Sequence, residues 1–290
     1  MKFVQFKNGN DINDIVAGIL VDGLVYTITD IDSNLPATVK DIIAAGDDAM
    51  AIIRSADVSA LTGVPESALT LVSPVHNPQK YLAIGMNYQD HADEARAAGI
   101  PVPTNQLWFN KQVSCITGPY SDIEVPWVSD KIDYEAEMAV VIGKRCRHVS
   151  VEDARDVIFG YMVSNDVTVR DWQAASQTFT LGKSFDTHGP LGPWLVTDDE
   201  IKDPLDLKMS LWVNDELRQQ ANTGLMIHNI YEQIAHLSTA MTLEPGDILA
   251  TGTCAGVGIA SNRFLKAGDV VKVAIENLGH IENAFVDEKK

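Results

Sequence analysis

Two glutamates, Glu135 and Glu137, stand two residues apart within an otherwise largely apolar run, residues 132–143. The β-branched end of this run is typical of a buried strand. Side chains alternate across a strand, so residues at i and i+2 share one face and the two carboxylates should converge. Because burying unpaired carboxylates is costly, such a pair is normally neutralised by a proton or a shared cation. The pattern indicates a divalent metal site, although a solvent-facing strand edge could carry the same two charges.

A third carboxylate, Asp166, interrupts the next strand-like apolar run, residues 157–168. Three carboxylates without a neighbouring histidine or thiolate pair favour Mg²⁺, Mn²⁺ or Ca²⁺ over Zn²⁺ or Cu²⁺. Taken alone, Asp166 could instead be a turn or bulge residue. We expect Glu135, Glu137 and Asp166 to ligate Mg²⁺ or Mn²⁺, with Ca²⁺ as a further possibility.

Charge and length limit the classes of function. The chain has 290 residues, enough for one large and one small domain, and a net charge of −18 that opposes binding to nucleic-acid phosphates or anionic lipid. No apolar stretch reaches the length of a membrane span, so we expect a cytoplasmic protein. Three widely spaced cysteines fit reduced thiols and not a disulfide framework.

The apolar patterning predicts a small N-terminal α/β domain, residues 1–75, and a β-rich domain, residues 76–290. Strands are expected at residues 15–20 and 24–28, and a helix at 39–53. Prolines and polar residues between 65 and 78 mark the boundary. Further helices are expected at residues 151–156 and 227–239.

A histidine and a glutamate form the second chemical pattern. His91 and Glu94 follow a predicted strand and begin an alanine-rich stretch; a spacing of three residues puts them on one helical face. A glutamate on one imidazole nitrogen raises the basicity of the other, as general-base catalysis requires. A surface His/Glu pair without function would look the same in sequence.

Taken together, these segments resemble the fumarylacetoacetate hydrolase family, in particular its acylpyruvase and 2-hydroxyhepta-2,4-diene-1,7-dioate isomerase-like branch. The resemblance covers about residues 76–287. It rests on an ordered series of segments: residues 81–91, 135–137, 165–173, 181–187 and 243–258. The family implies a β-rich α+β fold, with a mixed β-roll catalytic domain after the small N-terminal domain, and a homodimer.

The resemblance also implies roles for individual residues. His91 and Glu94 would be a general-base dyad on a mobile lid, and Lys183 would lie beside the carboxylates and stabilise developing negative charge. The residues that would contact substrate are Arg170, Gln173, Thr253, Tyr88 and Lys111. Two positions depart from the family pattern: Gln112 follows Lys111 where a proline is usual, and Cys254 stands where another proline is usual. Cys254 lacks a surrounding His/Asp pattern and is expected to pack, not to attack substrate.

The expected function is that of a metal-dependent hydrolase that cleaves a carbon–carbon bond in a β-diketo acid, such as an acylpyruvate or fumarylpyruvate, through a metal-stabilised enolate. The partner would be a small anionic 2-oxo acid. Decarboxylation of oxaloacetate, or isomerisation of an unsaturated 2-oxo diacid, would use the same metal site. A non-catalytic ion- or sugar-binding β domain is the alternative from another class.

Overall fold

The computed structural model describes residues 1–9, 14–97, 99 and 101–289, and β-strands dominate it. The strands are β1 (Lys2–Lys7), β2 (Ile15–Val21), β3 (Leu24–Thr27), β4 (Val64–Pro65), β5 (Leu71–Val72), β6 (Tyr81–Gly85), β7 (Leu107–Asn110), β8 (Ile116–Thr117), β9 (Ile123–Val125), β10 (Ile132–Asp133), β11 (Ala136–Ile142), β12 (Ile158–Asn165), β13 (Thr168–Val169), β14 (Gly189–Thr197), β15 (Lys208–Val213), β16 (Glu216–Asn222), β17 (Ile248–Ala250), β18 (Val270–Ile275) and β19 (Gly279–Asp287).

Helices are few and mostly short in the described part of the chain. The α-helices are α1 (Ile28–Ile31), α2 (Val39–Ser55), α3 (Gln89–Ala97), α4 (Arg170–Ala174), α5 (Ile230–Ala240) and α6 (Gly258–Ser261). Short 3-10 helices occupy Val58–Ala60, Glu66–Ala68, Val113–Cys115, Ala154–Val157, Asp198–Glu200 and Thr223–Leu225. None of the described helices combines the length and apolar character that crossing a bilayer requires.

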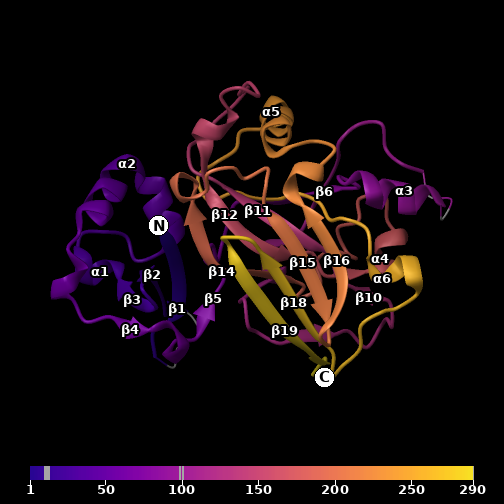
Figure 1. Cartoon of the computed structure of the whole chain (residues 1–290), viewed down its shortest axis with the longest axis horizontal. Coiled ribbons are helices and arrows are strands. Elements are labelled where there is room, and N and C mark those ends of the chain that lie inside the picture. Colours follow the sequence, from indigo (N-terminus) through magenta and orange to yellow (C-terminus); the bar gives the residue numbers. More distant parts are fainter. Residues whose placement is uncertain (10–13, 98, 100, 290) are drawn as a thin grey trace.

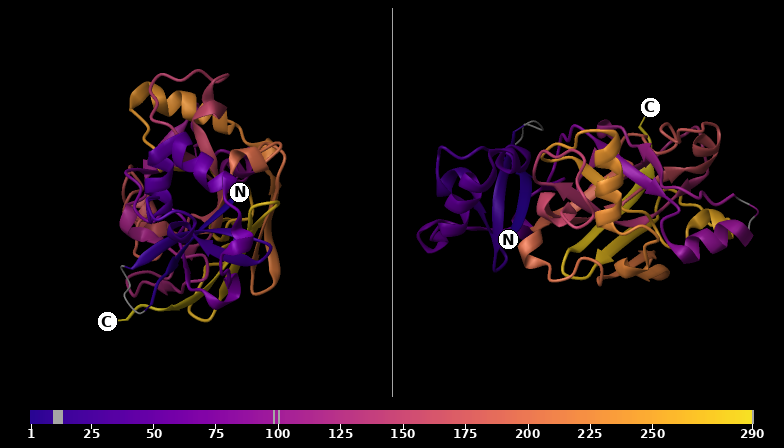
Figure 2. Two further views of the ribbon diagram at one scale, coloured as in Figure 1. Left: turned by 90° about the vertical axis from the view of Figure 1, so that its left-hand side faces the viewer. Right: turned by 90° about the horizontal axis from the view of Figure 1, so that it is seen from above.

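One large mixed sheet runs through the molecule in the order β4-β3-β2-β1-β14-β12-β11-β17-β6-β7, with β5 also paired to β1 and β8 to β14. A second sheet has the order β16-β15-β18-β19-β9, and β10 pairs with β13. The first elements of the chain lie at one end of the elongated molecule and α3 lies at the other (Figures 1 and 2).

The strand β11 lies in the interior of the large sheet, between β12 and β17. Every residue of β11 is buried, which explains its almost continuously apolar sequence. Its neighbour β12 is also nearly all buried, and Ala136 pairs with Asn165 at one end of the antiparallel ladder. This register brings the residues that precede β11 next to those that follow β12, which is the part of the fold that builds the site.

The N-terminal strands join the large sheet directly. Phe3 of β1 pairs with Leu195 of β14, and the buried face of α2 packs in the same hydrophobic cluster as Phe3. Thr38 caps α2 by accepting a hydrogen bond from the backbone of Asp41. The division of the chain near residue 75 stays a prediction, since hydrogen bonds between strands link the two parts.

Several elements agree with the sequence prediction and others do not. The strands β2 and β3 and the helix α2 lie where they were expected, to within two residues. The helix expected at 151–156 is wrong: that stretch is a turn followed by a 3-10 helix, Ala154–Val157. The helix expected at 227–239 begins only at Ile230, because Asn229 and Glu232 form a capping box there. Residues 98 and 100, beyond α3, lie outside the described residues.

His188 at the start of β14 is completely buried, and burial lowers its pKa to about 4. Its Nε2 lies 2.9 Å from the carbonyl oxygen of Glu124, which fits a neutral imidazole with the proton on Nε2. The unfolded chain takes up the proton near pH 6.5, and the folded chain only near pH 4. Stability from this group is therefore complete above pH 6.5 and is lost as the pH falls toward 4.

We predict that His188→Gln reduces the acid sensitivity of the protein. Between pH 7 and pH 5 the free energy of unfolding of the wild type should fall by about 2 kcal/mol more than that of the variant. Urea denaturation at the two pH values measures the difference. An identical loss of stability in both proteins would show that His188 does not titrate in this way.

Candidate metal and substrate site

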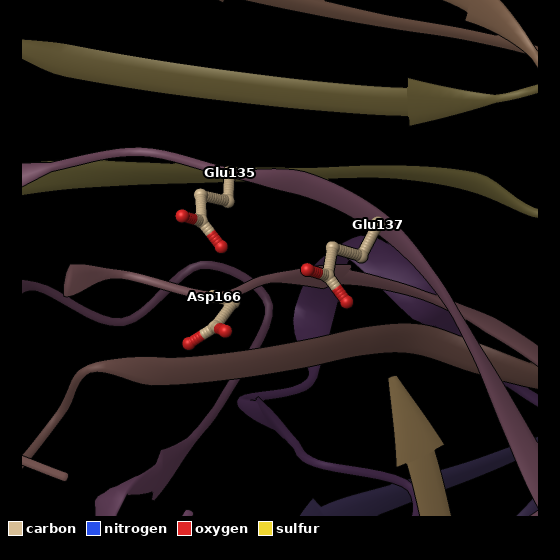
Figure 3. Close-up of side chains that lie close together, drawn as sticks. All are labelled: Glu135, Glu137 and Asp166. Atoms are coloured by element: carbon tan, nitrogen blue, oxygen red, sulfur yellow. The ribbon is translucent and has the colours of Figure 1, made fainter. Parts of the chain in front are cut away.

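Glu135, Glu137 and Asp166 converge at one point between strands (Figure 3). One carboxylate oxygen from each lies within 4.8 Å of the others, and the three side chains are 5%, 1% and 0% exposed. Glu137 belongs to β11, and Asp166 follows the end of β12. The sequence expectation of one continuous strand is wrong in detail, because residues 134 and 135 separate β10 from β11. The two glutamates converge nevertheless.

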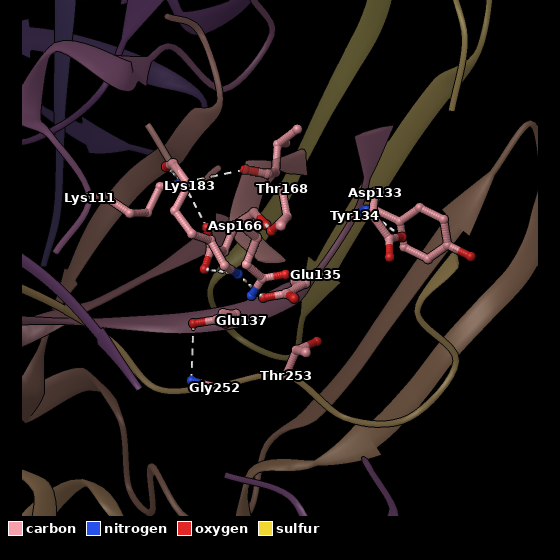
Figure 4. A network of polar contacts seen from close by, with 12 residues as sticks. Lys111, Asp133, Tyr134, Glu135, Glu137, Asp166, Thr168, Lys183, Gly252 and Thr253 are labelled. Atoms are coloured by element: carbon pink, nitrogen blue, oxygen red, sulfur yellow. Dashed lines mark hydrogen bonds and ion pairs between the residues drawn. The ribbon is translucent and has the colours of Figure 1, made fainter. Parts of the chain in front are cut away.

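Two lysines neutralise part of this cluster. Lys183 Nζ lies 2.7 Å from both Glu135 Oε2 and Asp166 Oδ2, and Lys111 Nζ lies 2.6 Å from Asp166 Oδ1 (Figure 4). Both lysines are buried. Lys111 also donates to the carbonyl oxygens of Lys183 and His188. Burial would lower the pKa of Lys111, but Asp166 together with the nearby Cys115 and Glu135 outweighs this effect, so the pKa is raised and the ammonium stays charged.

Glu137 lacks such a partner among the described residues. Its Oε2 accepts one hydrogen bond, at 3.0 Å, from the backbone N–H of Gly252. Burial, and then the charges of Asp166 and Glu135, raise the pKa of Glu137 well above its usual range. For Glu135, burial acts in the same direction, but Lys183 and Arg170 outweigh it and lower the pKa. The negative charge of Glu137 is therefore the one that needs a further cation.

Arg170, the first residue of α4, forms ion pairs with Glu135 of the cluster and with Asp133 beside it. Its Nη1 lies 2.7 Å from Glu135 Oε1 and 3.0 Å from Gln173 Oε1, and its Nε lies 2.8 Å from Asp133 Oδ2. Asp133 also accepts hydrogen bonds from the backbone N–H groups of Gly258 and Ile259. The arginine is thus fixed by acids on two sides, and α6 is fixed to the same aspartate.

A cavity of ≈ 280 Å³ opens onto one side of the carboxylate cluster. Its polar lining consists of residues that the sequence had indicated: His91, Glu94, Glu135, Arg170, Gln173, Lys183 and Thr253. The remaining wall is largely apolar and includes Ile84, Met86, Leu107, Phe109, Phe179, Val257 and Ile259. A mostly apolar cavity with a few converging polar groups is typical of a small-molecule site.

His91 and Glu94 lie on α3 and contact each other as their spacing predicts. His91 Nδ1 is 3.2 Å from Glu94 Oε2, while Glu94 Oε1 accepts a hydrogen bond from the backbone N–H of Gly256 at 3.3 Å. Both residues line the cavity. The glutamate favours the tautomer with its proton on Nδ1, which leaves Nε2 free to accept a proton.

Tyr88 and Lys111, which were expected to contact substrate, are buried, and neither is among the described residues that line the cavity. Lys111 contacts Asp166 of the carboxylate cluster. Their role as substrate contacts stays a prediction. Thr253, by contrast, lines the cavity and is 4% exposed, directly after Gly252 (Figure 4).

Sequence reasoning missed three contributors to the site. Asp133 stands at the start of the same run as the two glutamates, and its polar character there was an available signal. Gln219 on β16 bonds to Thr253 and to the backbone of Ala136, but nothing in its local sequence marks it. The apolar cavity wall comes from segments scattered along the chain, so no local pattern reveals it.

A family model described as "Fumarylacetoacetate (FAA) hydrolase C-terminal" matches residues 80–286. The chain belongs to the fumarylacetoacetate hydrolase family. This family member is 40% identical, over 291 residues, to a Xenopus laevis protein named oxaloacetate tautomerase fahd2, mitochondrial. The alignment covers 99% of this chain and 90% of that protein. The cytoplasmic location expected from sequence is not confirmed, since this relative is named as mitochondrial.

Solved structures of family members share the whole fold. Fumarylacetoacetate hydrolase from Exiguobacterium antarcticum has a TM-score of 0.86 and 33% identity, covering 99% of this chain and 100% of that one. Maleylpyruvate hydrolase from Sphingobium sp. SYK-6, solved with manganese(II) and pyruvate, has a TM-score of 0.84 and 33% identity, covering 100% of both chains. The family and the β-rich fold expected from the sequence are confirmed, and the family is one of enzymes.

The cluster has the chemistry of a divalent cation site. Four buried carboxylates, those of Asp133, Glu135, Glu137 and Asp166, face three buried cations. Each carboxylate oxygen has two lone pairs, so the bonds from lysine and arginine leave room for a further cation. All candidate ligands are oxygens, which Mg²⁺ and Mn²⁺ prefer. The carboxylates therefore fit a hard divalent ion, and its identity remains part of the proposal below.

Glu137→Gln and Asp166→Asn should both lower the affinity for Mg²⁺ or Mn²⁺ by at least roughly tenfold, measured by calorimetry. Their effects on the metal-free protein should differ. Glu137→Gln removes a carboxylate without a cationic partner and should leave the melting temperature unchanged or raised. Asp166→Asn leaves Lys111 and Lys183 without a shared partner and should cost about 3–5 kcal/mol.

Asp130→Asn is the matched control, because the Asp130 side chain is 87% exposed and lies outside the cluster. It should change neither metal affinity nor stability. Normal metal binding by Glu137→Gln would contradict the assignment of the three carboxylates as ligands.

Proposed function

We propose that this protein is a divalent-metal-dependent enzyme that interconverts the keto and enol forms of oxaloacetate or a closely similar 2-oxo diacid. The observation that carries the proposal is the placement of the His91–Glu94 pair in the same cavity as Glu135 and Lys183. A base and a group that stabilises negative charge thus border one small volume. The Xenopus relative, aligned over nearly the whole chain, supports this choice of substrate.

The reaction requires a proton to leave the carbon next to the 2-oxo group and a proton to reach the oxo oxygen. His91 Nε2 would accept the carbon proton, while Glu94 holds the imidazole orientation and stabilises the positive charge it gains. The same nitrogen, now protonated, would return a proton to the substrate. A divalent cation held by the three carboxylates would supply Lewis-acid stabilisation of the negative charge on the oxo oxygen.

Other residues would position the substrate and exclude water. Thr253 and Gln173 line the cavity and offer hydrogen-bonding groups to a carboxylate, and Arg170 presents its guanidinium beside them. The wall formed by Phe109, Phe179 and its apolar neighbours would limit the access of water to the substrate. A low local dielectric strengthens each of these electrostatic interactions.

Hydrolysis of an acylpyruvate, the function expected first from the sequence, is the second candidate. The His91–Glu94 pair suits activation of water as well as proton transfer at carbon, and the manganese–pyruvate complex of the Sphingobium enzyme favours this chemistry. Decarboxylation of oxaloacetate would use the same stabilised enolate. Assays of the Mg²⁺- and Mn²⁺-loaded protein with oxaloacetate and with acylpyruvates distinguish the three reactions. Tautomerisation changes the enol absorbance, hydrolysis releases a carboxylic acid, and decarboxylation releases CO₂.

His91→Ala and Glu94→Gln should lower the rate of oxaloacetate tautomerisation by roughly 10²–10⁴-fold, because the proton-transfer group is lost or misaligned. Metal affinity should stay near the wild-type value. Asp93→Asn is the matched control: Asp93 is the exposed neighbour of Glu94 on α3 and lies outside the cavity lining. Wild-type turnover by His91→Ala would rule out this base.

The substrate carboxylate next to the oxo group should be essential. We expect its methyl ester to react at least roughly tenfold more slowly than the free acid, because the ester loses the charge that the cavity's cationic and donor groups stabilise. Initial rates measured on both compounds with the same metal-loaded protein test this. Equal rates would mean that the cavity does not recognise a 2-oxo acid.

A further inference from the structure

Gln219 joins the second sheet to the candidate site by three hydrogen bonds. Its Oε1 accepts from the backbone N–H of Ala136 at 2.9 Å. Its Nε2 donates to Thr253 Oγ1 at 2.8 Å and to the carbonyl oxygen of Cys254 at 2.9 Å. The side chain is 1% exposed and does not line the cavity among the described residues.

The backbone determines which way this amide points. The N–H of Ala136 can only donate a hydrogen bond, and the carbonyl group of Cys254 can only accept one. Rotating the Gln219 amide by 180° would place N–H against N–H and oxygen against oxygen in a buried site, at a cost of several lost hydrogen bonds. The group that faces Thr253 is therefore the NH₂ group, a donor.

This orientation determines the polarity of the Thr253 hydroxyl. Since Oγ1 accepts from Gln219, its own hydrogen must point elsewhere, and within the described part of the chain it has no acceptor. Thr253 lines the cavity, and Figure 4 shows it beside Glu135 and Glu137. The hydroxyl hydrogen is thus available to a ligand in the cavity.

We infer that Gln219 is a positioning residue that holds the Thr253 hydroxyl as a hydrogen-bond donor toward a carboxylate oxygen of the substrate; this inference rests on the proposed function. Because Gln219 occupies one lone pair of the Thr253 oxygen and leaves its hydrogen free, the hydroxyl is set to donate to an acceptor such as a carboxylate oxygen. The donor for the carboxylate is then held by a residue that does not touch the substrate.

Close packing fixes the position of the loop that carries Thr253 relative to Gln219. Gly256 has a φ of +99°, and a Cβ at this position would lie 2.1 Å from the carbonyl oxygen of Arg218 on β16. Gly252 has a φ of +95°, and its Cβ would lie 2.5 Å from that of Asn87. Only glycine allows the loop to approach both neighbours so closely.

Gln219→Glu tests the inference by reversing the polarity. The introduced carboxylate can still accept from Ala136 but cannot donate to Thr253, so it would draw the hydroxyl hydrogen away from the cavity. The KM for oxaloacetate should rise roughly tenfold to hundredfold, the range of a hydrogen bond to a charged group, while kcat changes by less than about threefold. The affinity of the Mg²⁺-loaded protein for oxalate, measured by calorimetry, should fall by a similar factor.

Gln220→Glu is the matched control, because it adds the same charge one residue along β16 on an exposed side chain. It should leave KM, kcat and oxalate affinity unchanged. In a Thr253→Val background, Gln219→Glu should have no further effect on KM, since the hydroxyl through which it acts is absent. Gln219→Met, which removes the donor without adding charge, gives a second test should the carboxylate impair folding, and should raise KM less than Gln219→Glu does.

Measuring KM of Gln219→Glu over a pH series separates the loss of a hydrogen-bond donor from general structural damage. When protonated, the introduced carboxyl group again offers one acceptor and one donor, as glutamine does. The titratable groups near it include the Cys254 thiol, 3.8 Å from Gln219 Nε2, Asp90 and Glu94, whose charges reach Cys254, and Glu135 and Glu137, which flank Ala136 in the sequence. These acids and burial favour the protonated form, so the ratio of variant to wild-type KM should fall as the pH is lowered from about 8 to about 6.

Two results would overturn the inference while the proposed function stands. One is an equal change of KM in Gln219→Glu and Gln220→Glu. The other is an effect of Gln219→Glu that persists in full when Thr253 is valine. If the wild type fails to tautomerise oxaloacetate, the proposed function is wrong instead. In that case the oxalate titrations of the same variants still decide whether Gln219 controls the Thr253 hydroxyl.

Discussion

The structure depends on the cost of burying carboxylates of like charge at one point. Glu135, Glu137 and Asp166 lie close together and are buried. Lys183 and Lys111 compensate most of their charge, and each lysine is itself buried only because acids surround it. Removing a single paired acid or lysine would leave a buried charge without its partner, which is costly. Under the proposed function a divalent cation would complete the set, and catalysis and folding would then depend on the same charges.

Strand periodicity predicted the centre of the site, but it could not predict what surrounds it. The i and i+2 spacing of Glu135 and Glu137 was sufficient, because convergence of alternate side chains survives even a break in the strand. The resemblance placed Lys111 among the substrate contacts, but its ion pair with the buried Asp166 was not predicted, because nothing in its local sequence records that partner. Gln219 was missed because its contacts depend on how two sheets pack, which no local pattern records.

Under the proposed function, the charged cluster and the base come from different parts of the fold. Glu135, Glu137 and Asp166 lie on or beside the ends of β11 and β12, and Lys183 lies in the turn between α4 and β14. His91 and Glu94 sit on α3, at one end of the molecule and far from the N-terminal elements (Figure 1). Under the proposed function, stabilising an enolate would require the cluster, whereas hydrolysis and tautomerisation would differ in what His91 deprotonates. Variation in α3 and the apolar wall would then redirect the reaction without disturbing the cluster.

The donor hydroxyl at Thr253 makes the two sides of the cavity differ in how they interact with an anion. On one side the carboxylate cluster repels an anion unless a cation intervenes, while on the other Thr253 attracts an anionic oxygen. Under the proposed function, a 2-oxo acid bound between them would turn its carboxylate toward the donors and its reactive carbon toward His91. Because the polarity of Thr253 follows from two backbone groups through Gln219, it does not depend on pH or on the metal. A ligand therefore meets a preorganised donor and spends no binding free energy on reorienting the hydroxyl.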